Sequence, residues 1–132
     1  MAFPADLRHF RRSEFDYPDH IDVNLLRLID EVRERAGVPI KVTSDVRTQA
    51  QHEALYPDPT SRPNSPHVRG KGIDFKPMPD TAENRMFVLY AILELWREGY
   101  WPELGLEIAT RHIHVDNDSQ LRRPHLWLGV SK

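Results

Sequence analysis

Three short runs that can form strands follow the longest helical pattern of the chain without another helix between them, and this order constrains the fold most. The helical pattern is AENRMFVLYAILELWREG, which Thr81 can cap and which ends near Gly99. The runs at 104–108, 111–116 and 125–129 have the lengths and alternation of strands. Because strands grouped at one end of a chain do not build a doubly wound sheet, we expect an α+β fold. Its small antiparallel sheet would be flanked by helices.

The first half of the sequence predicts two more helices and two more strands. Asp22 can cap a helix over 23–36, where apolar residues recur at three- and four-residue spacing, and Gly37 can end it. The helix after Thr81 is apolar around much of its circumference, so we expect it to pack deeply. We also expect a strand over 39–44, a short helix over 48–56, a proline-rich surface loop over 57–66 and a strand over 72–76.

The size and charge of the chain argue against several classes of protein. Residues 1–132 fit a single domain with one core. The net charge of −2 gives no reason to expect nucleic acid or an anionic membrane as a partner, and the basic pairs at 11–12 and 122–123 fit a solvated surface. There is no cysteine for a disulfide, and no apolar run reaches the ~18 residues of a membrane span. The N-terminus lacks the apolar segment of a secretory signal, so we expect the protein to be made in the cytoplasm. We also expect it to be a monomer.

One charged residue stands inside an apolar run where a strand is predicted. The stretch NSPHVRGKGIDFK places Asp74 between Ile73 and Phe75. A buried carboxylate must be paired or must bind a metal, because an isolated charge is very unfavourable away from water. The same stretch holds His67 in a turn-rich loop, so a metal site is one explanation for both residues.

A second group of polar side chains lies in RHIHVD, which ends at Asp116. Side chains alternate along a strand, so His112, His114 and Asp116 share one face and the apolar residues between them share the other. If this strand pairs with the strand of Asp74, then Asp74 and His114 can face the same space. Together with His67 they would provide three ligands for zinc and leave one position open for water. Zinc acidifies such a water so that it can attack a carbonyl.

The sequence resembles a known family at these motifs. SPHVRGKGID is similar to the Ser-x-His-x-x-Gly-x-small-x-Asp pattern of zinc D-alanyl-D-alanine carboxypeptidases and related peptidoglycan endopeptidases, many from phages. HIHVD resembles the later histidine-bearing strand of that family, VPIKVTSDVRT its earlier strand, and HLWLG the close of a phage-type subgroup. The resemblance spans about 14–129 and implies the hedgehog/DD-peptidase fold, which lysostaphin-type enzymes share.

The resemblance also implies roles for individual residues. His67, Asp74 and His114 match the ligands of a single Zn²⁺ ion. Arg47 matches an arginine that binds the substrate and steadies the oxyanion, and a planar guanidinium suits both tasks. Ser65 matches a position that shapes the ligand loop and hydrogen-bonds near the metal. The substrate would be the peptide stems of bacterial peptidoglycan.

The general base is not identified by the resemblance. Many relatives carry a glutamate three residues before the last histidine ligand, but this position is Arg111, which cannot accept a proton. His112, Asp116 and Glu107 are the possible substitutes. We favour His112, because a neutral imidazole can transfer protons near neutral pH. Asp116 fits better as a residue that orients a histidine ligand.

A few other residues carry weaker expectations. Asp45 stands where the family usually shows glycine, so it would either alter the substrate cleft or cap the following helix. We expect His52 on the exposed side of its short helix. The tryptophans at 96, 101 and 127 are expected in the core.

Two functions remain open from the sequence. The first is a zinc peptidase of the bacterial cell wall, either a carboxypeptidase or an endopeptidase. It would act after release as a phage or prophage endolysin, or as part of a virion. The second is a non-catalytic zinc domain of the same fold, used for binding or for virion assembly, which the missing glutamate favours. A metal-free binding module would require the ligand set and its spacing to be accidental.

Overall fold

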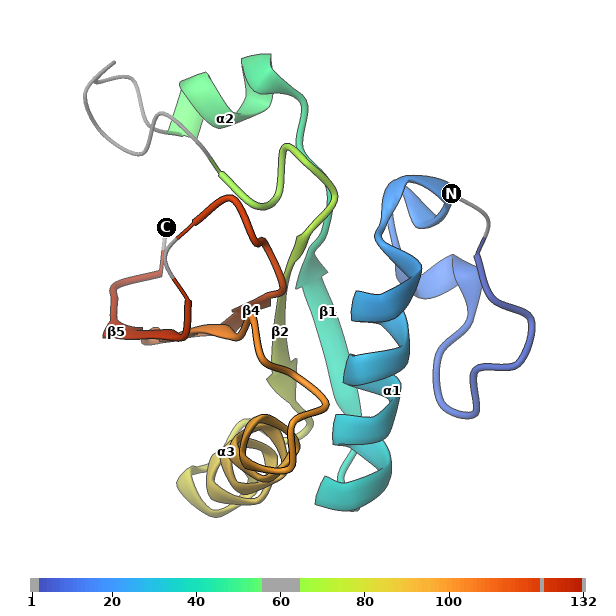
Figure 1. The fold of residues 1–132 in the computed structure, drawn as a ribbon, viewed down its shortest axis with the longest axis vertical. Helices are drawn as coiled ribbons and strands as arrows, with labels where there is room; N and C mark the ends of the chain where they lie inside the picture. Colours follow the sequence, from blue (N-terminus) through green and yellow to red (C-terminus); the bar gives the residue numbers. More distant parts are fainter. Residues whose placement is uncertain (1–2, 56–64, 122, 132) are drawn as a thin grey trace.

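The computed structural model describes residues 3–55, 65–121 and 123–131, which form an α+β fold around one sheet (Figure 1). The predicted fold class is confirmed, and each predicted helix and strand is present with ends within about two residues of those expected. Most of the predicted loop over 57–66 lies outside the described residues. The elements are α1 (Val23–Ala36), β1 (Ile40–Ser44), α2 (Gln49–Leu55), β2 (Gly72–Pro77), α3 (Ala82–Arg97), β3 (Gly105–Ile108), β4 (Ile113–Asp116) and β5 (His125–Leu128), preceded by 3-10 turns at Arg12–Glu14 and Pro18–His20.

The strand order is β1-β2-β4-β3-β5, and the sheet is mixed, whereas we expected an antiparallel one. β1 to β4 pair antiparallel, but β5 runs parallel to β3. The parallel direction of β5 follows from the end of β3 beside which β4 finishes. Gly105, the first residue of β3, pairs with Asp116 on one side and with His125 on the other. The chain therefore crosses this end of β3 and enters β5 in the direction in which β3 itself runs.

Both long helices begin at the predicted caps. The Asp22 carboxylate accepts a hydrogen bond from the Leu25 N–H at 3.3 Å, and the Thr81 side chain accepts one from the Asn84 N–H at 3.1 Å. Each bond satisfies one of the N–H groups that a helix leaves unpaired at its start. α1 ends at Gly37 with a φ of 70°, a left-handed conformation that glycine adopts without strain.

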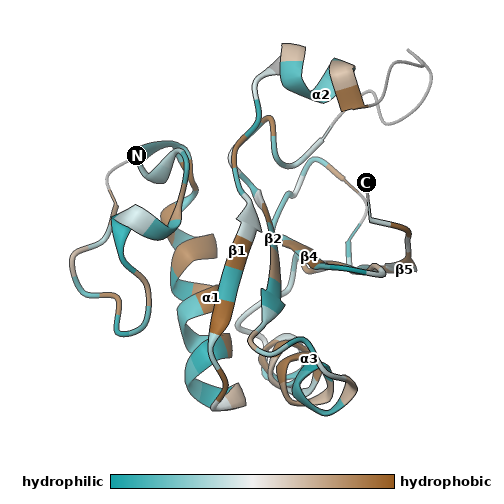
Figure 2. Cartoon of the chain, turned by 180° about the vertical axis from the view of Figure 1, so that it is seen from behind, coloured by the Kyte–Doolittle hydropathy of each residue, from teal (hydrophilic) through white to brown (hydrophobic). Residues whose placement is uncertain are grey.

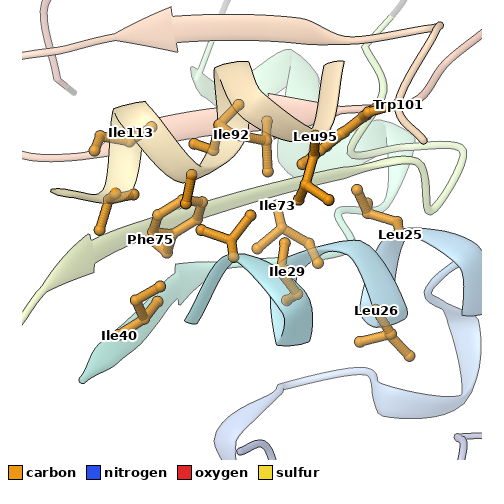
Figure 3. Close-up of a cluster of buried hydrophobic side chains, with 14 of the residues drawn as sticks. Leu25, Leu26, Ile29, Ile40, Ile73, Phe75, Ile92, Leu95, Trp101 and Ile113 are labelled. Carbon is orange, nitrogen blue, oxygen red and sulfur yellow. The ribbon is translucent and has the colours of Figure 1, made fainter. Parts of the chain in front are cut away.

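α1 and α3 contact each other and cover one face of the sheet (Figure 3). The strands alternate apolar and polar side chains, and the apolar ones point to this face. They are fully buried at Ile73, Phe75, Ile113 and Val115. Figure 2 shows the alternation as bands of colour along β1. Removing one such side chain to alanine typically lowers the free energy of unfolding by about 2–5 kcal/mol. The core therefore fixes which strand residues point to the opposite face.

The expectation that α3 packs deeply is correct for one side of the helix only. Val88, Ala91, Ile92 and Leu95 are buried, whereas the opposite side exposes apolar side chains such as Tyr90, which is 71% exposed. α3 contacts α1 and β2 on one side only. Its other side therefore stays exposed, although it also carries apolar residues. Among the described residues, no helix is both long and apolar enough to cross a membrane.

The opposite face of the sheet carries a continuous row of polar and aromatic residues. The strand register places one residue from each strand side by side across the sheet. In β1 this requires a bulge at Thr43, which shifts the register between Val42 and Ser44. The row reads Ser44, Asp74, His114, Glu107 and Trp127 from β1 to β5.

Candidate metal centre

Three side chains from separate segments meet on this open face. His67 Nε2 lies 3.0 Å from Asp74 Oδ1, and His114 Nδ1 lies 2.8 Å from the same oxygen. The two histidine nitrogens are 3.2 Å apart. His67 comes from the turn before β2, Asp74 from β2 and His114 from the paired strand β4. The structure thus brings together the three residues that the sequence suggested as ligands.

The spacing and chemistry of these three atoms fit a zinc ion. Ligand atoms about 2.0–2.1 Å from zinc in tetrahedral geometry are roughly 3.3 Å from one another. The three separations here are 2.8, 3.0 and 3.2 Å, so a slight outward movement would accommodate the ion. Two imidazoles and one carboxylate are a donor set that zinc accepts, with a fourth position left over. The ligand role itself remains a prediction.

The remaining ring nitrogen of each histidine is held by a partner. His67 Nδ1 lies 2.5 Å from the Asp45 carbonyl oxygen, and His114 Nε2 lies 2.8 Å from Asp116 Oδ2. In both cases the oxygen accepts the ring N–H, which leaves the other nitrogen turned towards Asp74. The contact with His114 is the one that an orienting role of Asp116 requires, and the role itself stays a prediction.

Asp45 does neither of the two things expected of it. Its carbonyl holds His67, and its buried carboxylate accepts a hydrogen bond from the Tyr17 N–H at 3.0 Å. Asp45 therefore connects the N-terminal segment to the end of β1 and contacts the candidate ligand His67. The sequence could not indicate this, because the partner is 28 positions away.

The ligand loop requires small residues at two positions and a hydroxyl at a third. Ser65 is buried, and its Oγ accepts a hydrogen bond from the His67 N–H at 3.3 Å, as the loop-shaping prediction implies. Gly70 has a φ of 72°, and a Cβ there would lie 2.1 Å from the His20 carbonyl oxygen. A Cβ on Gly72 would lie 3.0 Å from the His114 ring. Gly70 is therefore required by the backbone of His20, and Gly72 by the side chains of Pro66 and His114.

The electrostatics of the site differ among the three residues. Burial acts to raise the pKa of Asp74, but the charges and hydrogen bonds of the two histidines outweigh it and hold that pKa well below its usual range. Burial lowers the pKa of His67. Burial also acts to lower the pKa of His114, yet hydrogen bonds to Asp116 and Asp74 raise it to about 9. In the metal-free protein, His114 is therefore the candidate ligand that is a doubly protonated imidazolium at neutral pH.

This proton predicts how zinc binding depends on pH. If zinc binds through His114, it must displace the Nδ1 proton, so affinity should rise about tenfold per pH unit between pH 6.5 and 8.5, with one proton released per ion. In the metal-free protein the same shift stabilises the fold. That contribution is complete below the unfolded-state pKa of about 6.5 and is lost as the pH rises through about 9. Calorimetry in buffers of different ionisation enthalpy counts the released protons, and a count of zero or two would contradict the prediction.

The three residues line a cleft of about 650 Å³ on the open face of the sheet. Arg47 lines the same cleft, and its backbone N–H donates to the His67 carbonyl at 3.2 Å. His112 lies at the other side, with Nδ1 2.8 Å from Ser131 Oγ. Its Nε2 is 3.6 Å from Glu107 Oε1 and 3.8 Å from Asp74 Oδ2. The cleft therefore brings the side chains of Arg47 and His112 close to the three candidate ligands.

The three candidates for the general base differ in their surroundings. Asp116 is 0% exposed, and its carboxylate contacts His114 through one oxygen and Arg123 through the other. His112 and Glu107 face each other beside Asp74. These contacts leave His112 and Glu107 better placed than Asp116 to exchange protons with a bound molecule.

Several residues lie where the sequence reasoning did not put them. Arg123, expected on a solvated surface, is only 7% exposed and pairs with Asp116. His52, expected to be exposed, is buried at 2%. Trp101 is in the core as expected, but Trp96 is 42% exposed and Trp127 lies 5.6 Å from the His114 ring, in the cleft. Alternation along β5 could have identified Trp127 only if the pairing of β5 with β3 had been known.

Comparison with known proteins supports the fold. No protein-family model matches the sequence, and no curated protein matches it significantly. Among solved structures, the chain is similar to the Serratia marcescens L-Ala D-Glu endopeptidase ChiX. The TM-score is 0.64 at 19% sequence identity, and the match covers 88% of this chain and 96% of that chain. At this identity the likeness shows that the two chains share a fold. The hedgehog/DD-peptidase type stays what the resemblance of the sequence motifs implies.

Proposed function

We propose that the protein is a zinc-dependent peptidase that hydrolyses peptide bonds in the stems of bacterial peptidoglycan. The observation that carries the proposal is the convergence of His67, Asp74 and His114 in a cleft that also holds His112 and Arg47. The fold shared with ChiX, an L-Ala D-Glu endopeptidase, supports this class of substrate and favours internal cleavage over removal of a terminal residue.

The protein's own groups supply binding and proton transfer in this proposal. When bound by the three ligands, zinc would supply Lewis acidity, which polarises a peptide carbonyl and lowers the pKa of water. Arg47 binds a substrate carboxylate or the developing oxyanion from one side of the cleft. His112, oriented through Ser131, accepts a proton at Nε2 and returns it to the leaving amine. Glu107 lies beside that nitrogen and stabilises the imidazolium that forms.

The biological setting follows only from the resemblance of the sequence motifs. A phage or prophage endolysin, acting on the wall after its release, and a component of a virion are both consistent with HLWLG and the ligand pattern. A monomeric state and carboxypeptidase activity also stay predictions.

A non-catalytic zinc domain is the second candidate, and one observation favours it. Arg111 occupies the position of the family's glutamate and is exposed, with its backbone N–H bonded to Ser131 Oγ at 2.6 Å. If neither His112 nor Glu107 replaces that glutamate, the same centre would bind metal without hydrolysis.

The test combines metal content with hydrolysis. Protein purified without added metal should contain one zinc per chain, and it should release new amino groups from purified peptidoglycan until a chelator is added. Zinc without hydrolysis on several wall types would favour the non-catalytic domain. No zinc after reconstitution would contradict both functions.

A further inference from the structure

Arg123 forms a buried ion pair next to the candidate metal centre. Its guanidinium lies 2.5 Å from Asp116 Oδ1, and the two side chains are 7% and 0% exposed. The second carboxylate oxygen, Oδ2, accepts the His114 Nε2–H at 2.8 Å. Arg123 thus contacts the residue that contacts the candidate ligand His114, and it has no role in the proposed reaction.

The backbone of Asp116 is held in place, and the glycine opposite it leaves space for the carboxylate. A Cβ on Gly105, the residue paired with Asp116 across the sheet, would lie 2.4 Å from both carboxylate oxygens. The Asp116 carbonyl accepts a hydrogen bond from Trp101 Nε1 at 3.0 Å, and the Asp118 N–H lies 3.4 Å from Oδ1. The backbone is therefore held from the core side, and the carboxylate fills space that a larger neighbour would occupy.

The buried carboxylate of Asp116 needs a positive charge beside it, which the Arg123 guanidinium provides. A carboxylate with no exposed surface is strongly destabilised unless opposite charge or several donors surround it. The His114 Nε2–H occupies Oδ2, and Arg123 places a positive charge that does not titrate near neutral pH beside Oδ1. Without the guanidinium, the carboxylate would be expected to turn towards water or other donors and so to release the His114 ring.

We propose that Arg123 is a positioning residue of the metal centre. Its contact with Oδ1 holds the Asp116 carboxylate in the orientation in which Oδ2 receives the His114 Nε2–H, so that Nδ1 faces Asp74 and His67. The inference rests on the metal site of the proposed function. In this proposal the orientation of His114 in β4 depends on Arg123, which lies just before β5.

A nearby ion pair provides a matched control. Arg69 donates from Nε to Asp118 Oδ2 at 2.6 Å, and their side chains are 21% and 2% exposed. This pair joins the same loop to the ligand turn, but it ends on Asp118 and not on the carboxylate that His114 uses. Arg69→Met and Arg123→Met therefore remove the same chemistry from neighbouring places.

The experiment measures zinc affinity by chelator competition, and the visible absorption of the cobalt-substituted protein. Arg123→Met should bind zinc 10–100-fold more weakly than the unaltered protein, as expected when the partner of a ligand is lost. Its cobalt spectrum should change in intensity and position, because one ligand is no longer held in place. Arg123→Lys should recover part of the affinity. Arg69→Met should stay within about threefold of the unaltered protein, with the same spectrum, even if it unfolds at lower denaturant.

The outcomes separate the inference from the proposed function. Zinc affinity within threefold of the unaltered protein and an unchanged cobalt spectrum in Arg123→Met would overturn the positioning role while leaving the zinc site intact. Failure of the unaltered protein to bind zinc would overturn the metal site itself, and the inference with it. If circular dichroism shows Arg123→Met to be unfolded, Arg123→Lys decides by the same two measurements, because it keeps the charge but lacks the planar fork.

Discussion

Replacing Asp74 with asparagine is expected to weaken zinc binding on the order of 100-fold, which is roughly one ligand's share of the binding free energy. Peptidoglycan hydrolysis should fall to background. Asp74 Oδ1 lies within 3.0 Å of both His67 Nε2 and His114 Nδ1, so it supplies the negative charge at the centre of the ligand set. An amide has almost the same shape but no charge to offset the ion. Chelator competition gives the affinity, and release of amino groups gives the activity.

Asp30→Asn is the control for this substitution. Asp30 is also a buried aspartate, but it lies between α1 and the N-terminal segment, where its carboxylate accepts backbone hydrogen bonds from Arg8 and His9 at 3.2 and 2.9 Å. Its replacement should lower the free energy of unfolding and leave zinc affinity unchanged. Zinc binding by Asp74→Asn within threefold of the unaltered protein would mean that Asp74 is not a ligand.

Replacing His112 with alanine is expected to lower kcat by about 10²–10⁴-fold while zinc stays bound, since general acid–base catalysis contributes on that scale. Ser131 holds Nδ1, and Nε2 lies within 3.8 Å of both Glu107 and Asp74 carboxylates, inside the cleft. Alanine removes the group that carries the proton and leaves the three candidate ligands in place. Metal analysis of the purified variant, together with its steady-state rate, checks both parts of the prediction.

Two further variants identify the base. His125→Ala removes an exposed imidazole from the rim of the same cleft, where the ring packs 4.9 Å from Trp127, and it should change kcat by less than about threefold. Glu107→Gln should retain most of the rate if His112 is the base. A large loss in Glu107→Gln combined with a small loss in His112→Ala would assign the proton transfer to Glu107 instead.

Much of the fold could be predicted from local sequence patterns. The caps at Asp22 and Thr81 form as expected, because the side chain and the N–H that it receives are only three residues apart. The alternation around Asp74 and His114 gives each strand one apolar and one polar face, since successive side chains of a strand must point to opposite sides. These interactions need no information about the rest of the chain.

Other features could not be predicted because they depend on contacts between distant segments. Whether Trp127 lies in the cleft or in the core depends on β5 pairing parallel to β3. Asp45 meets Tyr17 and His67 across the fold, and Arg123 reaches Asp116 through the folding of the segment between β4 and β5. Single-residue charge patterns treat such arginines and aspartates as surface residues, since most of them are.

The sequence by itself determined the helices and the strands, because backbone periodicity and capping act over a few residues. The three candidate ligands were suggested by their residue types, by strand alternation and by the resemblance of their motifs to a known family. Only the tertiary structure decided that Ser44, Asp74, His114, Glu107 and Trp127 form one row across five strands. It also decided which nitrogen of each histidine faces the site, because the partners of His67 and His114 hold the other one. The physical reason is that burial and strand register are properties of the packed chain, so the environment of a charged side chain exists only once distant segments have met.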